Sequence, residues 1–182
     1  MMSGRAARWI LACALAAAAP AAAQPSLEYD VKAALLLNFA RFIEWPVGAF
    51  SNERAPITVC VFRSNPFGGT LERVLQGETI HDRRLTTRVV SGEADSESCH
   101  LLFVPEGVEA RAGALLRHRG SHAVTVGESS RFETMGGAVT LVLDAGRIRF
   151  NVNLEPIEAR GVRVSARMLK LANRVDKASP EK

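Results

Sequence analysis

Lys32-Ala33-Ala34-Leu35-Leu36-Leu37-Asn38-Phe39-Ala40-Arg41-Phe42-Ile43-Glu44-Trp45-Pro46 is the stretch that decides the fold, because its apolar residues recur at helical spacing. We expect one helix, with Ser26 as its N-cap and Pro46 as its end, since a residue before proline avoids the helical region. A helix with so wide an apolar surface is typical of one that packs against a sheet. The members of the stripe are Leu27, Val31, Leu35, Phe39, Phe42 and Ile43, widened by Leu36, Leu37 and Ala40.

The aromatic residues of this stretch allow a second interpretation. Phe39, Phe42 and Trp45 lie close together in the sequence, and aromatic side chains dominate the binding energy of protein interfaces. Part of this cluster is therefore a candidate partner-binding surface, while packing against the sheet remains the alternative for the whole helix.

The first 23 residues have the organisation of a secretory signal peptide. Arg5 and Arg8 precede a short apolar run from Trp9 to Ala19, and Ala21-Ala22-Ala23 forms an A-x-A cleavage site. The run is shorter than the roughly 20 apolar residues that span a bilayer. We expect cleavage before Gln24, export to the periplasm, and a single domain over residues 24–182 with an ordered part at about 27–175.

Removing 23 of the 182 residues leaves 159, with 21 basic and 19 acidic residues and a net charge of +2. This small excess, without a basic stripe interleaved with aromatics, does not indicate nucleic-acid binding. Two cysteines remain, Cys60 and Cys99, and an even number in an oxidising compartment favours one disulfide. Two unpaired buried thiols are the alternative.

Strand and helix patterns alternate along the middle of the chain. Predicted strands cover 57–62, 85–90, 99–104 and 123–126, with helices at 70–76 and 108–118. An antiparallel hairpin follows at 138–143 and 147–152, and two further helices begin after Asn153 and Ser165. The fold class is therefore α/β: a single domain with a mixed sheet of roughly six strands, about five helices on its faces and a C-terminal antiparallel hairpin.

One strand of the predicted hairpin has a polar face. Arg147, Arg149 and Asn151 alternate with Ile148, Phe150 and Val152, so each set shares one side of the strand. Guanidinium groups bind carboxylates and other anions through paired hydrogen bonds, which makes the polar row a candidate anionic-ligand site. A solvated outer face, or a row of salt bridges within the chain, is the alternative.

The residues that support catalysis or metal binding do not occur at the required spacings. His81, His100, His118 and His122 form no i, i+4 pair and no H-E-x-x-H motif. Cys99 and His100 are adjacent at a strand start, so their side chains point to opposite faces. Gly127-Glu128-Ser129-Ser130 does not provide a nucleophile motif of the G-x-S-x-G type. We therefore predict no enzyme activity, no metal site and no cofactor.

Several segments, in order along most of the mature chain, resemble the YfiR-like family of small bacterial periplasmic proteins. The segments are Asn38–Pro46, Ile57–Val61 with Asn65–Gly68, Cys99–Val104, Val124–Gly127, Gly136-Gly137, Arg149–Leu154 and Gly161–Ser165. The resemblance implies a periplasmic α/β domain that binds the periplasmic sensor region of a membrane-bound diguanylate cyclase and represses it, which limits cyclic di-GMP and biofilm formation.

The resemblance also implies a homodimer and a disulfide between Cys60 and Cys99. Some members carry a second cysteine pair later in the chain, which this sequence lacks. The leading hypothesis is a non-catalytic periplasmic regulator that does not itself span the membrane. The alternative is a periplasmic protein that binds a small anionic molecule through Arg147, Arg149 and Asn151.

Overall fold

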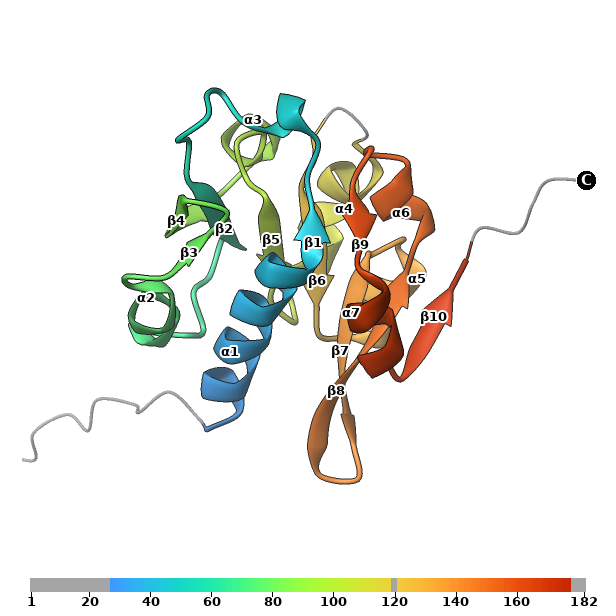
Figure 1. Cartoon of the computed structure of the whole chain (residues 1–182). Coiled ribbons are helices and arrows are strands. Elements are labelled where there is room, and N and C mark those ends of the chain that lie inside the picture. Colours follow the sequence, from blue (N-terminus) through green and yellow to red (C-terminus); the bar gives the residue numbers. More distant parts are fainter. Residues whose placement is uncertain (1–26, 119–120, 178–182) are drawn as a thin grey trace, which may run out of the picture.

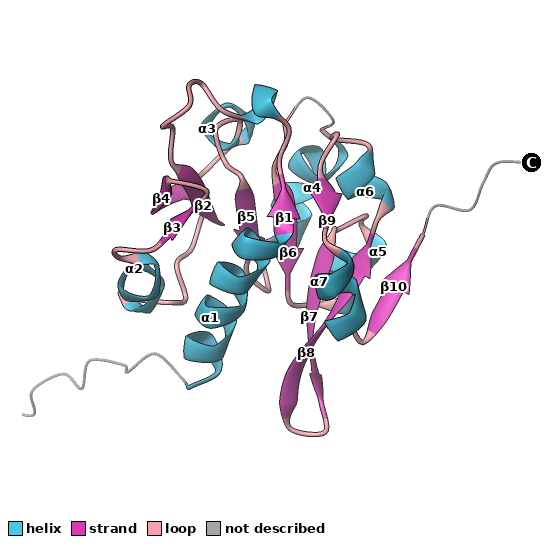
Figure 2. Ribbon diagram, in the orientation of Figure 1, coloured by secondary structure: helices cyan, strands magenta, loops and turns pink. Residues whose placement is uncertain are grey.

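The computed structural model describes residues 27–118 and 121–177, which form one layered α/β domain (Figure 1). An eight-stranded mixed sheet has the order β10-β8-β7-β6-β5-β2-β4-β3, and a separate two-stranded ladder pairs β1 with β9. Helices cover both faces of the large sheet (Figure 2). The predicted fold class is confirmed, while the predicted signal peptide and the Ser26 cap lie outside the described residues.

The centre of the sheet is parallel, as the alternation of strands and helices predicted. Its parallel strands are β2 (Ile57–Phe62), β4 (Arg83–Val90), β5 (Leu101–Val104), β6 (Val124–Gly127) and β7 (Val139–Asp144). The predicted hairpin joins β7 to the antiparallel β8 (Arg147–Asn153) through Ala145 and Gly146, both at positive φ. The large sheet has two strands more than the predicted six, the short edge strands β3 (Thr79–Ile80) and β10 (Arg174–Asp176).

Two hydrophobic cores lie on the two faces of the sheet. One core packs under α1 (Leu27–Phe42), α2 (Thr70–Leu75) and α7 (Ala166–Leu171), which lie in front of the sheet in Figure 1. The other packs under α4 (Glu109–Arg117) and α5 (Ser130–Thr134), with α3 (Glu93–Ser96) beside α4. The short α6 (Glu155–Glu158) follows β8. Successive residues of β2 alternate between the cores, which explains its nearly continuous apolar sequence.

The helix α1 differs from its predicted form in two ways. It ends at Phe42, because Ile43 and Glu44 form β1, which pairs antiparallel with β9 (Arg163–Val164). Its buried face is also rotated: Leu27 and Val31 are 80% and 42% exposed, while the buried residues of α1 are Lys32, Ala33, Leu36, Leu37, Phe39 and Ala40. The prediction that this helix packs against the sheet is correct, but part of the predicted stripe faces outward.

Two elements in the last third of the chain were not predicted correctly. The last helix ends at Leu171, and Arg174 begins β10, a strand parallel to β8 that the sequence pattern did not predict. The helix α5 was missed altogether. Its Phe132 ring is fully buried between two glycines, since a Cβ on Gly127 or Gly137 would lie 2.2 or 2.0 Å from that ring. The two glycines are therefore required by the close approach of an aromatic side chain.

Candidate functional site

The end of α1 leads into an aromatic cluster that we name the Trp45 cluster: Trp45, Phe50 and His100. The Phe50 and His100 rings are stacked, with centroids 4.5 Å apart, and Trp45 lies edge to face with His100 at 5.6 Å. The 3₁₀ turn Val47–Ala49 lies between the two aromatic residues of this segment. Because His100 immediately precedes β5, the cluster lies at the amino ends of the parallel strands.

His100 holds this turn against the sheet as a neutral imidazole. The backbone N–H of Thr58 donates to His100 Nδ1 over 3.1 Å, so Nε2 carries the proton and donates to the Ala49 carbonyl oxygen over 3.1 Å. Burial lowers the pKa of His100 to about 4, aided by the positive charge of Arg83, although the bond to Ala49 acts in the opposite direction. The side chain is therefore an uncharged clamp between the turn and the strand.

Arg83 closes the cluster from the neighbouring strand β4. Its guanidinium carbon lies 3.7 Å from the Phe50 ring centroid, and Nη1 donates to the carbonyl oxygens of Asn52 and Ala55 over 2.9 and 2.8 Å. This combines a cation–π contact with two charge-assisted hydrogen bonds to one loop. The loop that follows the turn is thus fixed to the edge of the sheet.

A cavity of about 290 Å³ opens beside Trp45. Val47 on its rim is 89% exposed, while Trp45 Nε1 is buried without a hydrogen-bond acceptor among the described residues. An apolar recess with an exposed apolar rim is suited to an apolar group of a partner. The lining residues are Ile43, Glu44, Trp45, Val47, Phe50, Ile57, Ile80, His81 and Arg83.

The three aromatic residues proposed for partner binding do not form one surface. Phe39 is 1% exposed and packs edge-on against Phe150, with ring centroids 4.9 Å apart, so it is a core residue. Phe42 is partly buried beside α7, where the Arg167 guanidinium lies 5.8 Å from its ring centroid. Trp45 lines the cavity. Sequence spacing alone did not separate these three environments.

The opposite end of α1 carries a buried ionic cluster. Lys32 Nζ contacts Glu128 Oε2 and lies 2.5 Å from Glu28 Oε1, and both Lys32 and Glu128 side chains are over nine-tenths buried. Glu128 Oε1 accepts hydrogen bonds from the Tyr29 hydroxyl over 3.1 Å and from the Glu106 backbone N–H over 2.9 Å. Sequence analysis missed this cluster, although a lysine inside an apolar helical stretch is a signal that such a residue has a buried partner.

The comparison with protein families agrees with this architecture. A family model described as YfiR/HmsC-like matches residues 29–173, from the ionic end of α1 to the start of β10. The chain belongs to the YfiR/HmsC-like family. Members of this family are periplasmic proteins with a regulatory rather than a catalytic role. No helix within the described residues is long and apolar enough to cross a bilayer.

The YfiR/HmsC-like segments singled out in the sequence have identifiable structural roles. Cys60 and Cys99 form a disulfide, with Cα atoms 5.8 Å apart, which joins β2 to the residue before His100. Both half-cystines are buried in the core beneath α4. The bridge therefore lies on the face of the sheet opposite the Trp45 cluster, and the chain connects the two because Cys99 directly precedes His100.

The candidate anion row of this YfiR/HmsC-like chain is divided by burial. Arg147 and Arg149 are exposed on the hairpin, and Arg149 Nε lies 3.6 Å from Asp144 Oδ2. Asn151 is 7% exposed, and its Oδ1 accepts a hydrogen bond from Asn173 Nδ2 over 3.3 Å. The structure therefore separates buried Asn151, which lies opposite Arg174 of β10, from the two exposed arginines nearer the hairpin turn.

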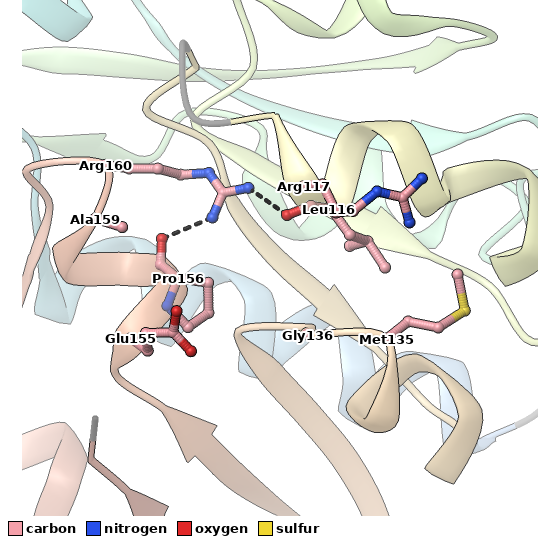
Figure 3. Close-up of a pocket in the computed structure, with 8 residues that line it drawn as sticks. All are labelled: Leu116, Arg117, Met135, Gly136, Glu155, Pro156, Ala159 and Arg160. Atoms are coloured by element: carbon pink, nitrogen blue, oxygen red, sulfur yellow. Dashed lines mark hydrogen bonds between the residues drawn. The ribbon is translucent and has the colours of Figure 1, made fainter. Parts of the chain in front are cut away.

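Another cavity of about 340 Å³, between α4 and α6, is bordered by a structural arginine (Figure 3). Arg160 is 5% exposed and donates to the carbonyl oxygens of Leu116 and Pro156 over 2.8 and 2.6 Å. The first of these carbonyls belongs to the last turn of α4, where a cation complements the helix dipole. The guanidinium thus ties α6 to the end of α4.

Proposed function

We propose that this YfiR/HmsC-like chain is a periplasmic regulator that binds a membrane-bound signalling protein, a diguanylate cyclase, and represses it. Repression limits cyclic di-GMP and biofilm formation. The family match over residues 29–173 carries this proposal. As part of the same proposal, the chain is exported to the periplasm, its first 23 residues are cleaved off, and it acts as a homodimer.

The Trp45 cavity is the proposed contact surface for the periplasmic part of the partner. Two observations support it: the exposed Val47 rim and the apolar lining. An apolar partner side chain that enters the cavity would bury this rim. Such burial favours binding, because removing apolar surface from water lowers the free energy of the complex.

The test is crosslinked capture from native cell envelopes, using tagged protein and mass spectrometry. Val47→Asp places a charge on the rim without removing a buried side chain. Leu27→Asp is the matched control, because Leu27 is similarly exposed at the other end of α1 and an acidic residue suits a helix N-terminus. We expect the wild type and Leu27→Asp to capture an inner-membrane protein with a cytoplasmic cyclase domain, and Val47→Asp to reduce capture about tenfold or more.

Two results would contradict this proposal at different levels. Equal capture by Val47→Asp would move the contact surface away from Trp45 and leave the regulator role standing. Failure of folded, abundant wild-type protein to capture any membrane signalling protein would remove the regulator role. The second candidate function, binding of a small anion, is favoured by the exposure of Arg147 and Arg149 on the hairpin. Loss of capture in Arg149→Ala alone would place the anion site first.

A further inference from the structure

The ionic end of α1 forms one wall of a second cavity, of about 370 Å³. The cavity lies just beyond the carboxyl ends of β5 and β6, since Glu106 and Glu128 follow these strands. The crevice outside the carboxyl ends of parallel strands is the usual ligand position in open α/β sheets. The β7–β8 hairpin supplies the opposite wall. The lining residues are Glu28, Tyr29, Lys32, Glu106, Glu128, Leu141, Val142, Leu143 and Ile148.

The charges around this cavity do not balance. Three carboxylates, Glu28, Glu106 and Glu128, face one ammonium group, Lys32. Lys32 already contacts two of the carboxylates, and its Nζ lies 4.4 Å from the Tyr29 ring centroid. Among the described residues, the lining therefore has an excess of two negative charges, and its one cation is engaged. This arrangement opposes an anionic ligand and favours a positively charged one.

The polar floor of the cavity is fixed rather than mobile. Glu128 receives hydrogen bonds from Tyr29 and the Glu106 backbone in addition to the Lys32 contact. Burial and the negative charge of Glu128 raise the pKa of Tyr29 to about 12, so its hydroxyl keeps the proton that it donates. Burial alone would lower the pKa of Lys32, but hydrogen bonds to Glu128 and Glu28 outweigh it and raise the pKa. Lys32 is therefore protonated at neutral pH.

The hairpin wall is apolar and adjoins the acidic rim. Leu141, Val142, Leu143 and Ile148 line it, and Leu143 is 75% exposed. Arg147 and Arg149 point to the other face of the hairpin by strand alternation, so they do not neutralise the cavity. A fitting ligand combines a short hydrocarbon part with a cationic head near Glu106 and Glu28, the two more exposed carboxylates.

We propose that the cavity between the start of α1 and the β7–β8 hairpin is a binding site for a small organic cation, an aliphatic amine in its ammonium form. The hydrocarbon part packs on Leu143 and Ile148, and the ammonium group pairs with Glu106 and Glu28. This site lies at the opposite end of α1 from the Trp45 cavity, and it does not depend on the proposed regulator function.

The test compares three probes of equal chain length: pentylamine, 1-pentanol and pentanoate. Calorimetric titration at low ionic strength should show pentylamine binding at least tenfold more tightly than 1-pentanol, with pentanoate weakest. Tyr29 is the only tyrosine of the sequence, so a pentylamine-induced change in tyrosine near-ultraviolet absorption locates the bound probe. Equal affinity for pentylamine and 1-pentanol, or no tyrosine change, would overturn the proposal.

Two variants test the acidic rim without removing the buried Glu128. Glu106→Gln and Glu28→Gln should each raise the pentylamine Kd about fivefold, the effect of a partly exposed ion pair. Glu72→Gln on α2 is the matched control, because Glu72 is exposed and lies outside the cavity lining, yet the net charge changes equally. Unchanged pentylamine binding in both rim variants, or equal weakening in Glu72→Gln, would contradict the proposed site.

Discussion

The two ends of α1 are attached to the domain by different physical means. At its start, Lys32 and Tyr29 contact Glu128, so the attachment is made by charges and hydrogen bonds. Beyond its end, Trp45 packs against the neutral His100, and a disulfide lies directly beside that histidine. One attachment is an ion pair between nearly inaccessible side chains, and the other is aromatic packing on a neutral histidine, whose neighbour Cys99 is bridged to β2 on the other face of the sheet.

The two ends should therefore be sensitive to different substitutions and conditions. A buried ion pair contributes little net stability, yet removal of one partner leaves an uncompensated buried charge and is strongly destabilising. The aromatic end has no such buried charge. It depends on His100 staying uncharged, and the disulfide at Cys99 restricts the chain next to this histidine. The following predictions compare the ends, beginning with the largest effect.

Removal of the disulfide should have the largest effect. Cys60 and Cys99 close a loop with a sequence separation of 39 residues, for which the chain-entropy model gives about 4 kcal/mol. We expect the double variant Cys60→Ala/Cys99→Ala to lose about this free energy of unfolding in urea denaturation. Reductant should lower the stability of the wild type and leave that of the variant unchanged. A loss below about 1 kcal/mol would show that loop closure is not important at the aromatic end.

Removal of the lysine at the ionic end should have the next largest effect. Lys32→Met leaves the Glu128 carboxylate buried with two hydrogen-bond donors and no counter-charge, and we expect a loss of about 3 kcal/mol. Adding Glu128→Gln should restore at least about 1 kcal/mol, because it removes the uncompensated charge. Urea denaturation measures both effects.

The exposed Lys170 provides the control for the loss of a positive charge. Lys170→Met on α7 should change the free energy of unfolding by less than about 0.5 kcal/mol. If Lys170→Met and Lys32→Met destabilise the protein equally, net charge explains the loss and the buried pair does not. A double variant less stable than Lys32→Met would show that Glu128 stabilises the fold even without Lys32.

The regular part of the fold followed from local sequence patterns. The strand β2 and the β7–β8 hairpin were predicted closely, because apolar alternation and turn residues are encoded within a few positions. The strand β1 was not, because Ile43 and Glu44 pair with residues of β9 more than a hundred positions away. Such a pairing leaves no periodic signal at either strand, and the continuing apolar sequence indicated helix instead.

The candidate sites show the same limit. Trp45 was identified from its residue type, but its partners His100 and Arg83 come from different strands, and no motif joins them. Lys32 is buried where Glu128, 96 residues away, supplies a counter-charge, and it belongs to the buried face of α1 that the apolar stripe did not predict. Asn151 likewise lies opposite Arg174 of β10, an edge strand that the sequence pattern did not predict.

Acid should weaken the aromatic end by a smaller amount. The pKa of His100 falls from 6.5 to about 4 on folding, so between these values the unfolded chain binds more protons and stability falls as pH decreases. From pH 7.5 to pH 5 we expect this histidine to account for a loss of about 2 kcal/mol. His100→Gln, which keeps a donor and an acceptor but does not titrate, should lack this part of the pH dependence in urea denaturation. An identical pH dependence in both proteins would mean that the fold does not hold His100 neutral. The aromatic end of α1 would then not be weakened by acid through this histidine.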